Sequence, residues 1–231
     1  MNKLQGQKTA LITGGSRRIG RYLTTYFAHK GYRIIVHYNR SDAEIETLCN
    51  ELPSSLIYPI QADFSSQSSI FQFLERIQTL YPIDLCINNA STFKNNSFQS
   101  MPNHDLMEDI TVNTLAPILI TNAMAKINHH AHVIQCSDAR LEQHLDTSFS
   151  YAISKQLLET YTRIVKKQFP PTFRINTLRL DRVIPNVLTG SDHQHFTQKE
   201  LEVLRKIADL IYKIDNDTQI NQQYFYFPCG Y

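Results

Sequence analysis

The chain has 231 residues, of which 42% are hydrophobic and 19% are charged. This length and apolar content suit one folded domain with a sizeable core and exclude a largely disordered chain. The net charge of +2 is too near neutral to indicate a nucleic acid or a membrane surface as a partner. Because no apolar run reaches about 18 residues and the N-terminus lacks an apolar signal region, we expect a cytoplasmic protein.

Short apolar segments alternate along the chain with segments of helical spacing. Strands that are nearly continuous in apolar residues are typical of a parallel sheet buried on both faces. We therefore predict an α/β fold, with one doubly wound parallel sheet of the Rossmann type in a single domain over residues 1–231. The expected strands are Thr9–Thr13, Arg33–Tyr38, Ser55–Ile60, Asp84–Asn88, His132–Ser137, Phe173–Leu180 and Gln223–Pro228. The clearest helical segments are Ile19–His29, Asp42–Leu52 and Ser68–Leu80.

The segment "TGGSRRIG" over Thr13–Gly20 directly follows the first expected strand. A turn with glycines at Gly14 and Gly20 can present backbone N–H groups and a helix N-terminus to a pyrophosphate. The position after the first strand therefore predicts dinucleotide binding. Two arginines, Arg17 and Arg18, occupy a turn that usually relies on bare backbone.

The end of the second strand predicts which dinucleotide binds. NAD sites usually place an acidic residue here to hold the ribose hydroxyls. This chain instead reads "HYNRS", in which Arg40 and Ser41 offer a guanidinium and a hydroxyl that suit a 2′-phosphate, and Arg17 can approach the same group. We therefore predict NADPH as the cofactor. The alternative is that Arg40 is only a solvated turn residue.

The cysteines and histidines do not predict a metal site. The four cysteines are far apart and form no CxxC pair, and we expect Cys86 and Cys136 to be packed core thiols. The His-rich pieces Asn128–His132 and Asp192–His195 have no cysteine or carboxylate partner at a ligand spacing, so solvated turns are the better interpretation.

The segment "YAISK" places Tyr151 four residues before Lys155. In a helix the two side chains share one face. A lysine charge near a phenol favours the phenolate and lowers its pKa toward a value useful for proton transfer. Surface helices carry this spacing by chance, so it needs support from other motifs.

That support comes from "NNAS" after the fourth strand and "VNTLAP" in the following helical segment. Together with "TGGSRRIG" and "YAISK", these motifs resemble the short-chain dehydrogenase/reductase superfamily over nearly the whole chain. The resemblance implies Tyr151 as proton donor, Lys155 as holder of the nicotinamide ribose, and Asn113 as support of a water relay. Most members have a serine thirteen residues before the tyrosine, where this chain has Asp138.

An aspartate at that position is similar to the pteridine reductases and the bacterial dihydromonapterin reductases. "HYNRS" and "NNASTF" also resemble segments of these enzymes. The resemblance implies that Ser91 contacts substrate and cofactor phosphate, that Phe93 stacks on the pterin ring, and that Arg18 reaches both the pyrophosphate and the pterin edge. Arg18, Phe93 and Asp138 have structural alternatives: a solvated helix start, a loop anchor and a turn cap. The implied reaction is hydride transfer from NADPH to a pterin C=N system, with protonation of the adjacent nitrogen by Tyr151.

The motifs and the resemblance together predict the full set of site residues, in which Val183 is our choice for the backbone donor to the nicotinamide. The expected cofactor contacts are Gly14, Ser16, Arg17, Arg18, Ile19, Gly20, Asn39, Arg40, Ser41, Asp63, Phe64, Asn89, Ala90, Ser91, Lys155 and Val183. The expected substrate contacts are Arg18, Ser91, Phe93, Asp138 and Tyr151, with a substrate loop at about 181–196.

The pattern departs from the superfamily after the sixth strand. Leu180-Asp181 stands where a Pro-Gly turn usually cups the nicotinamide, which puts that contact in doubt. A homo-oligomer, either a dimer or a tetramer, is expected from the resemblance alone. Two other functions remain open: a general carbonyl or 3-oxoacyl thioester reductase, and a non-enzymatic NADP(H)-binding sensor.

Overall fold

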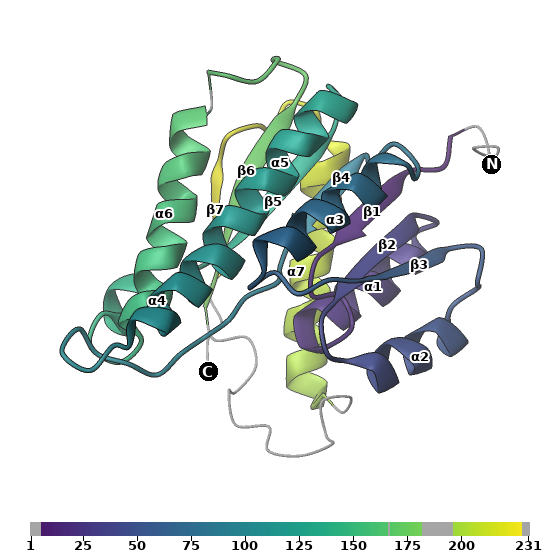
Figure 1. Cartoon of the computed structure of the whole chain (residues 1–231). Helices are drawn as coiled ribbons and strands as arrows, with labels where there is room; N and C mark the ends of the chain where they lie inside the picture. The colour runs from purple at the N-terminus through teal and green to yellow at the C-terminus, as the bar shows by residue number, and fades with distance from the viewer. Residues whose placement is uncertain (1–5, 166, 182–195, 228–231) are drawn as a thin grey trace.

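The computed structural model describes residues 6–165, 167–181 and 196–227. Its centre is a seven-stranded sheet in the order β3-β2-β1-β4-β5-β6-β7, in which every neighbouring pair is parallel. Figure 1 shows the strands running through the middle of the molecule with helices on both sides. The strands are β1 (Thr9–Ile12), β2 (Arg33–Tyr38), β3 (Ile57–Gln61), β4 (Leu85–Asn88), β5 (His132–Asp138), β6 (Arg174–Leu180) and β7 (Tyr224–Phe227).

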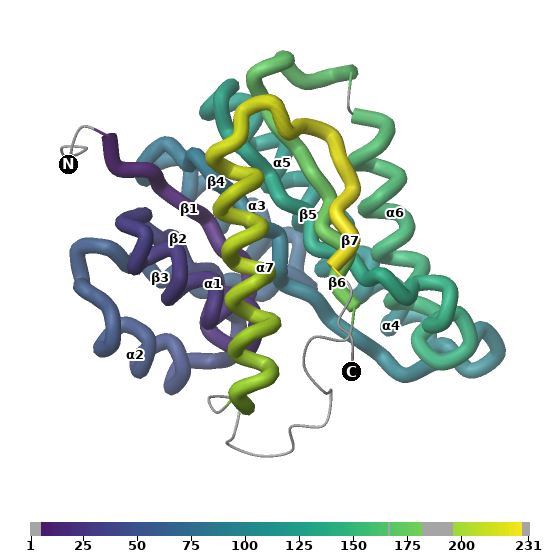
Figure 2. Tube along the Cα trace, turned by 180° about the vertical axis from the view of Figure 1, so that it is seen from behind, coloured from purple at the N-terminus to yellow at the C-terminus, as the bar shows by residue number. Residues whose placement is uncertain are grey.

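The helices form two layers, one on each face of the sheet. Residues alternate along the strands, so Ala10 and Ile12 pack toward one core while Leu11 packs toward the other. The first core is covered by α1 (Arg18–His29), α2 (Asp42–Glu51) and α7 (Gln198–Asn216), and Figure 2 shows α1 and α7 in front of the sheet. The opposite face carries α3 (Gln67–Gln78), α4 (Asn103–Ile110), η1 (Thr111–Leu115), α5 (Ala116–Ile127) and α6 (Phe149–Val165), with the short η2 (Leu141–His144) beside α6.

The predicted fold is confirmed: each expected strand is present, with ends that agree within two residues. Gly31 follows α1 with φ of +84°, as expected of a left-handed helix stop. Cys86 and Cys136 are buried free thiols, as expected. The extent of the domain, residues 1–231, stays a prediction.

A long helical segment runs without a break through α4, η1 and α5, over Asn103–Ile127. By length and composition alone it could cross a membrane, but more than half of its apolar window is buried inside the protein. It lies against α3 and α6 as a core helix. The π-helical turn at η1 puts the Asn113 side chain in the interior, where it is fully buried.

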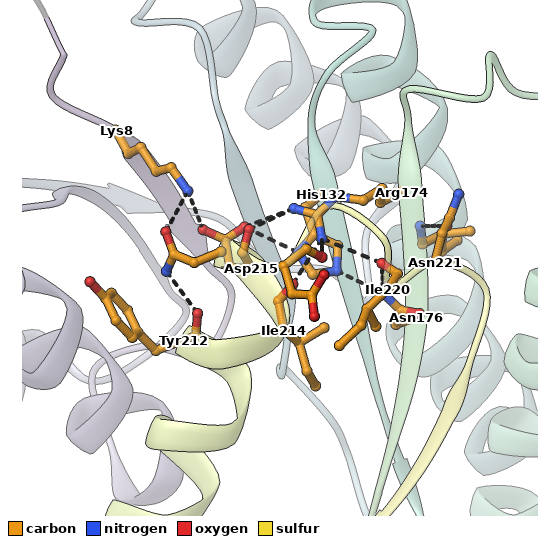
Figure 3. Close-up of polar contacts among 12 residues, drawn as sticks. Lys8, His132, Arg174, Asn176, Tyr212, Ile214, Asp215, Ile220 and Asn221 are labelled. Carbon is orange, nitrogen blue, oxygen red and sulfur yellow. Dashed lines mark hydrogen bonds and ion pairs between the residues drawn. The ribbon is translucent and has the colours of Figure 1, made fainter.

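A buried polar cluster ties the end of α7 to the amino ends of the central strands (Figure 3). Asp215 accepts hydrogen bonds from Lys8 Nζ at 2.8 Å, Tyr32 Oη at 2.7 Å and His132 Nδ1 at 3.1 Å. Arg174 donates to the carbonyls of Ile214 and Asp215 and so caps the helix C-terminus.

This cluster corrects the interpretation of Asn128–His132 as a solvated turn. His129 and His130 are exposed, but His132 begins β5 and is fully buried. Its Nε2 accepts from Asn176 Nδ2 at 2.9 Å while Nδ1 faces Asp215. Both ring nitrogens therefore have partners, and the imidazole belongs to the core.

Candidate active site

Two adjoining cavities open at the carboxyl edge of the sheet, where the chain changes direction between β1 and β4. In doubly wound sheets the loops after the strands form a crevice at such a reversal. The first cavity has a volume of about 320 Å³ and the second about 330 Å³. Gly14, Arg17, Ala90 and Ser91 line both cavities, so the two form one continuous site.

The turn between β1 and α1 needs two of its glycines. Gly14 has φ of +62°, in the left-handed region. A Cβ on Gly20 would lie 2.0 Å from the Gly14 carbonyl oxygen, so α1 can approach the turn only with glycine there. Arg18 also has a positive φ, of +50°, at the first residue of α1. Arg18 thus has a backbone conformation that would suit glycine.

His37 packs against this turn and holds it by a hydrogen bond. It was not identified as a site residue from the sequence. Its Nδ1 accepts the Gly14 N–H at 3.1 Å, and its Nε2 donates to the Ala62 carbonyl at 3.0 Å. The ring stacks on Phe64 with centroids 3.8 Å apart. Burial lowers the pKa of His37 to about 4, so the imidazole is neutral at neutral pH. The signal in the sequence was a histidine one residue before the end of a buried strand.

The second cavity gathers the residues predicted to bind the 2′-phosphate. The hydroxyls of Ser16 and Ser41 are hydrogen-bonded at 2.5 Å. The Arg40 side chain lines the same cavity and is 86% exposed. Arg17 forms an ion pair with Glu44 in the first turn of α2. Glu44 was not predicted, although an acidic residue early in a helix is a readable signal. Of the other predicted cofactor residues, Asn39, Asp63 and Phe64 line this cavity.

The first cavity contains the predicted tyrosine and lysine on α6. Lys155 is buried and donates from Nζ to the Cys136 carbonyl at 3.0 Å. Its Nζ lies 6.0 Å from the centroid of the Tyr151 ring. Burial lowers the pKa of Lys155.

The pKa of Tyr151 was expected to be lowered, but in this structure it is raised. Tyr151 is buried and its hydroxyl donates to Asp138 Oδ2 at 3.1 Å. Burial first, and then the Asp138 carboxylate, raise the pKa of Tyr151 well above its ordinary value. The phenol therefore keeps its proton at neutral pH.

Asp138 stands at the end of β5, where its carboxylate collects three donors. Oδ1 accepts the Arg140 N–H at 2.7 Å, and Oδ2 accepts from both Tyr151 and His144, the latter at 3.2 Å. Phe93 is 41% exposed and lies 4.7 Å from the Tyr151 ring, centroid to centroid. A phenol, a carboxylate and an aromatic face therefore meet in one cavity.

Asn113 does not line either cavity. Its Nδ2 donates to Ser154 Oγ at 3.0 Å, and its Oδ1 accepts the Thr92 N–H at 2.8 Å and the Ser91 hydroxyl at 3.0 Å. It therefore joins the loop after β4 to α6, and its role in a water relay stays a prediction.

The structure brings nearly all predicted residues to this site. The first cavity is lined by Gly14, Arg17, Arg18, Ile19, Gly20, Asn89, Ala90, Ser91, Phe93, Asp138, Tyr151 and Lys155. Val183 and most of the expected substrate loop lie outside the described residues. Asp181, the first residue of the expected substrate loop, lines this cavity, as do Arg140 and His144, which were not predicted as site residues. Arg140 Nε forms an ion pair with Asp181 Oδ1 at 2.9 Å. Asp181 is one of the two residues that stand where the superfamily usually has the Pro-Gly turn.

Comparison with known proteins agrees with this geometry. The short chain dehydrogenase family profile matches residues 8–195. The chain is 30% identical to a dihydromonapterin reductase of Citrobacter koseri over 200 residues, covering 83% of this chain and 79% of that protein. It is 28% identical to a dihydromonapterin reductase of Enterobacter sp. over 201 residues, 84% of this chain and 81% of that one.

Solved structures share the fold. FolM alternative dihydrofolate reductase 1 from Brucella canis, complexed with NADP, superposes with a TM-score of 0.82 at 21% identity, over 98% of this chain and 94% of that one. The corresponding Brucella suis protein gives 0.79 at 22%, over 95% and 93%. With the glycine turn, the Tyr-x-x-x-Lys helix and the profile match in agreement, the chain belongs to the short chain dehydrogenase family.

Proposed function

We propose that this protein is an NADPH-dependent reductase that converts a dihydropterin to a tetrahydropterin. The observation that carries the proposal is Asp138, hydrogen-bonded to Tyr151 where most of the superfamily has a serine. A carboxylate at this place suits a ring with N–H donors, and Phe93 offers a flat ring an aromatic face in the same cavity. Relatives named dihydromonapterin reductase support the same substrate class.

NADPH fits the two cavities by the chemistry of their walls. The left-handed Gly14 and the close packing of α1 at Gly20 bring the N-terminus of α1 to the first cavity, where its backbone N–H groups can face a pyrophosphate. Arg40 and the Ser16–Ser41 hydroxyl pair suit a 2′-phosphate, and both Brucella structures are complexes with NADP. When bound, NADPH supplies the hydride.

The chain's own residues supply the proton and the positioning. Tyr151 keeps its proton at neutral pH and can give it to a ring nitrogen, which requires a protonated group at the start of the reaction. We assign Lys155 to the nicotinamide ribose, with Arg18 and Ser91 at the edge of the pterin. These assignments follow from the family resemblance and from the shared cavity.

The test is NADPH oxidation by the purified protein with dihydromonapterin, dihydrobiopterin, dihydrofolate and an acetoacetyl thioester. We expect turnover of at least one dihydropterin and a loss of about 10²- to 10⁴-fold in Tyr151→Phe. NADPH affinity, measured by fluorescence titration, should be unchanged in that variant.

Two outcomes would contradict the proposal. Turnover of the thioester alone would indicate a general carbonyl or 3-oxoacyl thioester reductase. Tight NADPH binding without turnover of any of these substrates would indicate a non-enzymatic sensor. A homo-oligomeric state and a cytoplasmic location remain predictions, which light scattering of the purified protein and fractionation of cells can test.

A further inference from the structure

Among the described residues of the first cavity, two titratable side chains are bonded to Asp138: Tyr151 and His144. The proposed function gives a role to Tyr151 but none to His144. His144 ends η2, and its Nε2 lies 3.2 Å from Asp138 Oδ2. The Tyr151 hydroxyl lies 3.1 Å from the same oxygen. One carboxylate oxygen therefore stands between a phenol and an imidazole.

The surroundings fix this arrangement. The backbone N–H of Arg140 holds the other carboxylate oxygen of Asp138 at 2.7 Å, which sets the plane of the carboxylate. The His144 ring meets Phe93 edge-on at 5.4 Å and Tyr151 edge-on at 5.7 Å, centroid to centroid. The imidazole is therefore held by two aromatic rings and one carboxylate, with 11% of its side chain still exposed.

A tyrosine that has given its proton away must recover one before the next turnover, and a side chain that exchanges protons with solvent can supply it. Tyr151 is only 8% exposed, and its hydroxyl donates to Asp138. Imidazole is the side chain whose ordinary pKa lies nearest neutral pH, so it can both give a proton and take one from water. His144 is placed to do this through Asp138.

We propose that His144 returns the proton to Tyr151 through Asp138 after each reduction, an inference that rests on the proposed function. Reduction of the C=N bond consumes one hydride, with oxidation of NADPH to NADP⁺, and one proton from the Tyr151 hydroxyl. The phenolate then takes the proton from Asp138 Oδ2, which has received it from Nε2 of the His144 imidazolium. The neutral imidazole keeps its proton on Nδ1 and regains one from solvent on Nε2, so that every group is back in its starting state.

His144 shares the first cavity with several charged and titratable groups. The charged and titratable groups that line the cavity with His144 include Asp138, Tyr151, Lys155, Arg18, Arg140 and Asp181. The pH dependence of turnover must therefore be measured rather than read from a single pair.

The test compares His144→Gln with the wild type in two regimes. Glutamine keeps a donor for Asp138 but cannot carry a proton through its side chain. In a single turnover with NADPH and a dihydropterin, His144→Gln should react at the wild-type rate, because Tyr151 starts protonated. In steady state its kcat should fall about 10²-fold, and its kcat should depend less on pH near neutrality than that of the wild type.

Two further variants complete the design. His144→Phe removes the hydrogen bond to Asp138 as well as the proton, so its single-turnover rate should also fall; this loss measures what the hydrogen bond alone contributes to the geometry of the site. His29→Gln, an exposed histidine at the end of α1, is the matched control and should be unchanged in both regimes.

The possible failures can be told apart. Absence of wild-type turnover with any dihydropterin would overturn the proposed function. Wild-type turnover together with an unchanged kcat and pH profile in His144→Gln would overturn the role of His144 alone. Equal losses in the single-turnover and steady-state rates of His144→Gln would show a structural contribution only and would also overturn it.

Discussion

Arg18 is where the local backbone and the site make opposite demands. A residue with φ of +50° is strained unless it is glycine, by about 1–2 kcal/mol. Yet its side chain lines the first cavity beside Phe93 and Asp138. Burial lowers the pKa of the Arg18 guanidinium, although the group remains charged at neutral pH. A strained arginine at this turn is consistent with a ligand contact that glycine could not make.

Two substitutions separate the strain from the contact. Arg18→Gly and Arg18→Ala both remove the guanidinium, and both should lower kcat/KM for a dihydropterin by at least about tenfold. Only glycine relieves the left-handed backbone, so Arg18→Gly should be more stable than Arg18→Ala by up to about 1 kcal/mol in urea unfolding. Equal stability of the two variants, or wild-type kcat/KM in both, would contradict this account.

The sequence could predict which residue types meet at the site but not how they bond. Tyr151, Lys155 and Asp138 were identified from spacing and family resemblance. The direction of the Tyr151 pKa shift was predicted wrongly, because the sequence does not show that Lys155 bonds to the Cys136 carbonyl while Asp138 faces the phenol. His144 was missed because its proximity to Asp138 depends on a short 3-10 turn that the sequence pattern does not reveal.

At the scale of elements, strands were easier to predict than helix details. Each buried parallel strand reads as a short apolar run that the sequence displays directly. The start of α7 was also readable, because Thr197 and Glu200 form a capping box, but it was not used. The π-helical turn at Thr111–Leu115 has no comparable signal, since its extra residue depends on packing against α6 and the loop after β4.

One buried carboxylate on α4 joins two site-forming segments. Asp109 is fully buried and accepts the Thr92 hydroxyl and the Ser150 hydroxyl, each at 2.5 Å. Thr92 lies between the predicted substrate residues Ser91 and Phe93, and Ser150 precedes Tyr151. Asp109 therefore fixes the distance between the loop after β4 and the start of α6.

Asp109→Asn tests this link. The amide offers only one acceptor oxygen, so one of the two hydroxyls loses its short bond to the carboxylate and keeps only its longer contact to Asn96 or Asn113, at a cost of about 1–3 kcal/mol in the free energy of unfolding. We expect kcat/KM for a dihydropterin to fall while the Kd for NADPH changes little. Glu75→Gln, an exposed carboxylate on α3, is the control and should match the wild type. A variant as stable and as active as the wild type would remove the structural role of Asp109.

At the scale of the whole molecule, the two ends of the sheet differ in how far they could be predicted. The carboxyl edge carries motifs that follow strands, so the sequence alone predicted that its residues would meet. The polar cluster at the amino edge unites Lys8, His132, Arg174 and Asp215, which no motif connects (Figure 3). Such contacts depend on the register of β5 and β6 against α7, which the sequence pattern does not reveal.

Both ends of the sheet make the molecule sensitive to acid. At the carboxyl edge, the pKa of His37 falls from 6.5 to about 4 through burial. At the amino edge, burial lowers the pKa of His132. Burial alone would raise the pKa of Asp215, but its hydrogen-bond partners outweigh this and hold the pKa at about 2 against an ordinary 3.8. In each case the unfolded chain binds protons more readily than the folded chain, so stability is complete above about pH 6.5 and falls as the pH decreases.

The loss of stability at low pH can be assigned to His37 by substitution. Between about pH 6.5 and pH 4, His37 alone should remove roughly 3 kcal/mol from the free energy of unfolding, at 1.36 kcal/mol per pKa unit. Urea unfolding at pH 8, 6.5, 5 and 4 should therefore show little change in the first step and a steep loss afterwards. His37→Gln should be less stable at pH 8, because the Gly14 N–H loses a rigid acceptor, but its stability should depend less on pH below 6.5. A pH dependence as steep as that of the wild type would show that the imidazole beneath the cofactor turn is not the group that titrates.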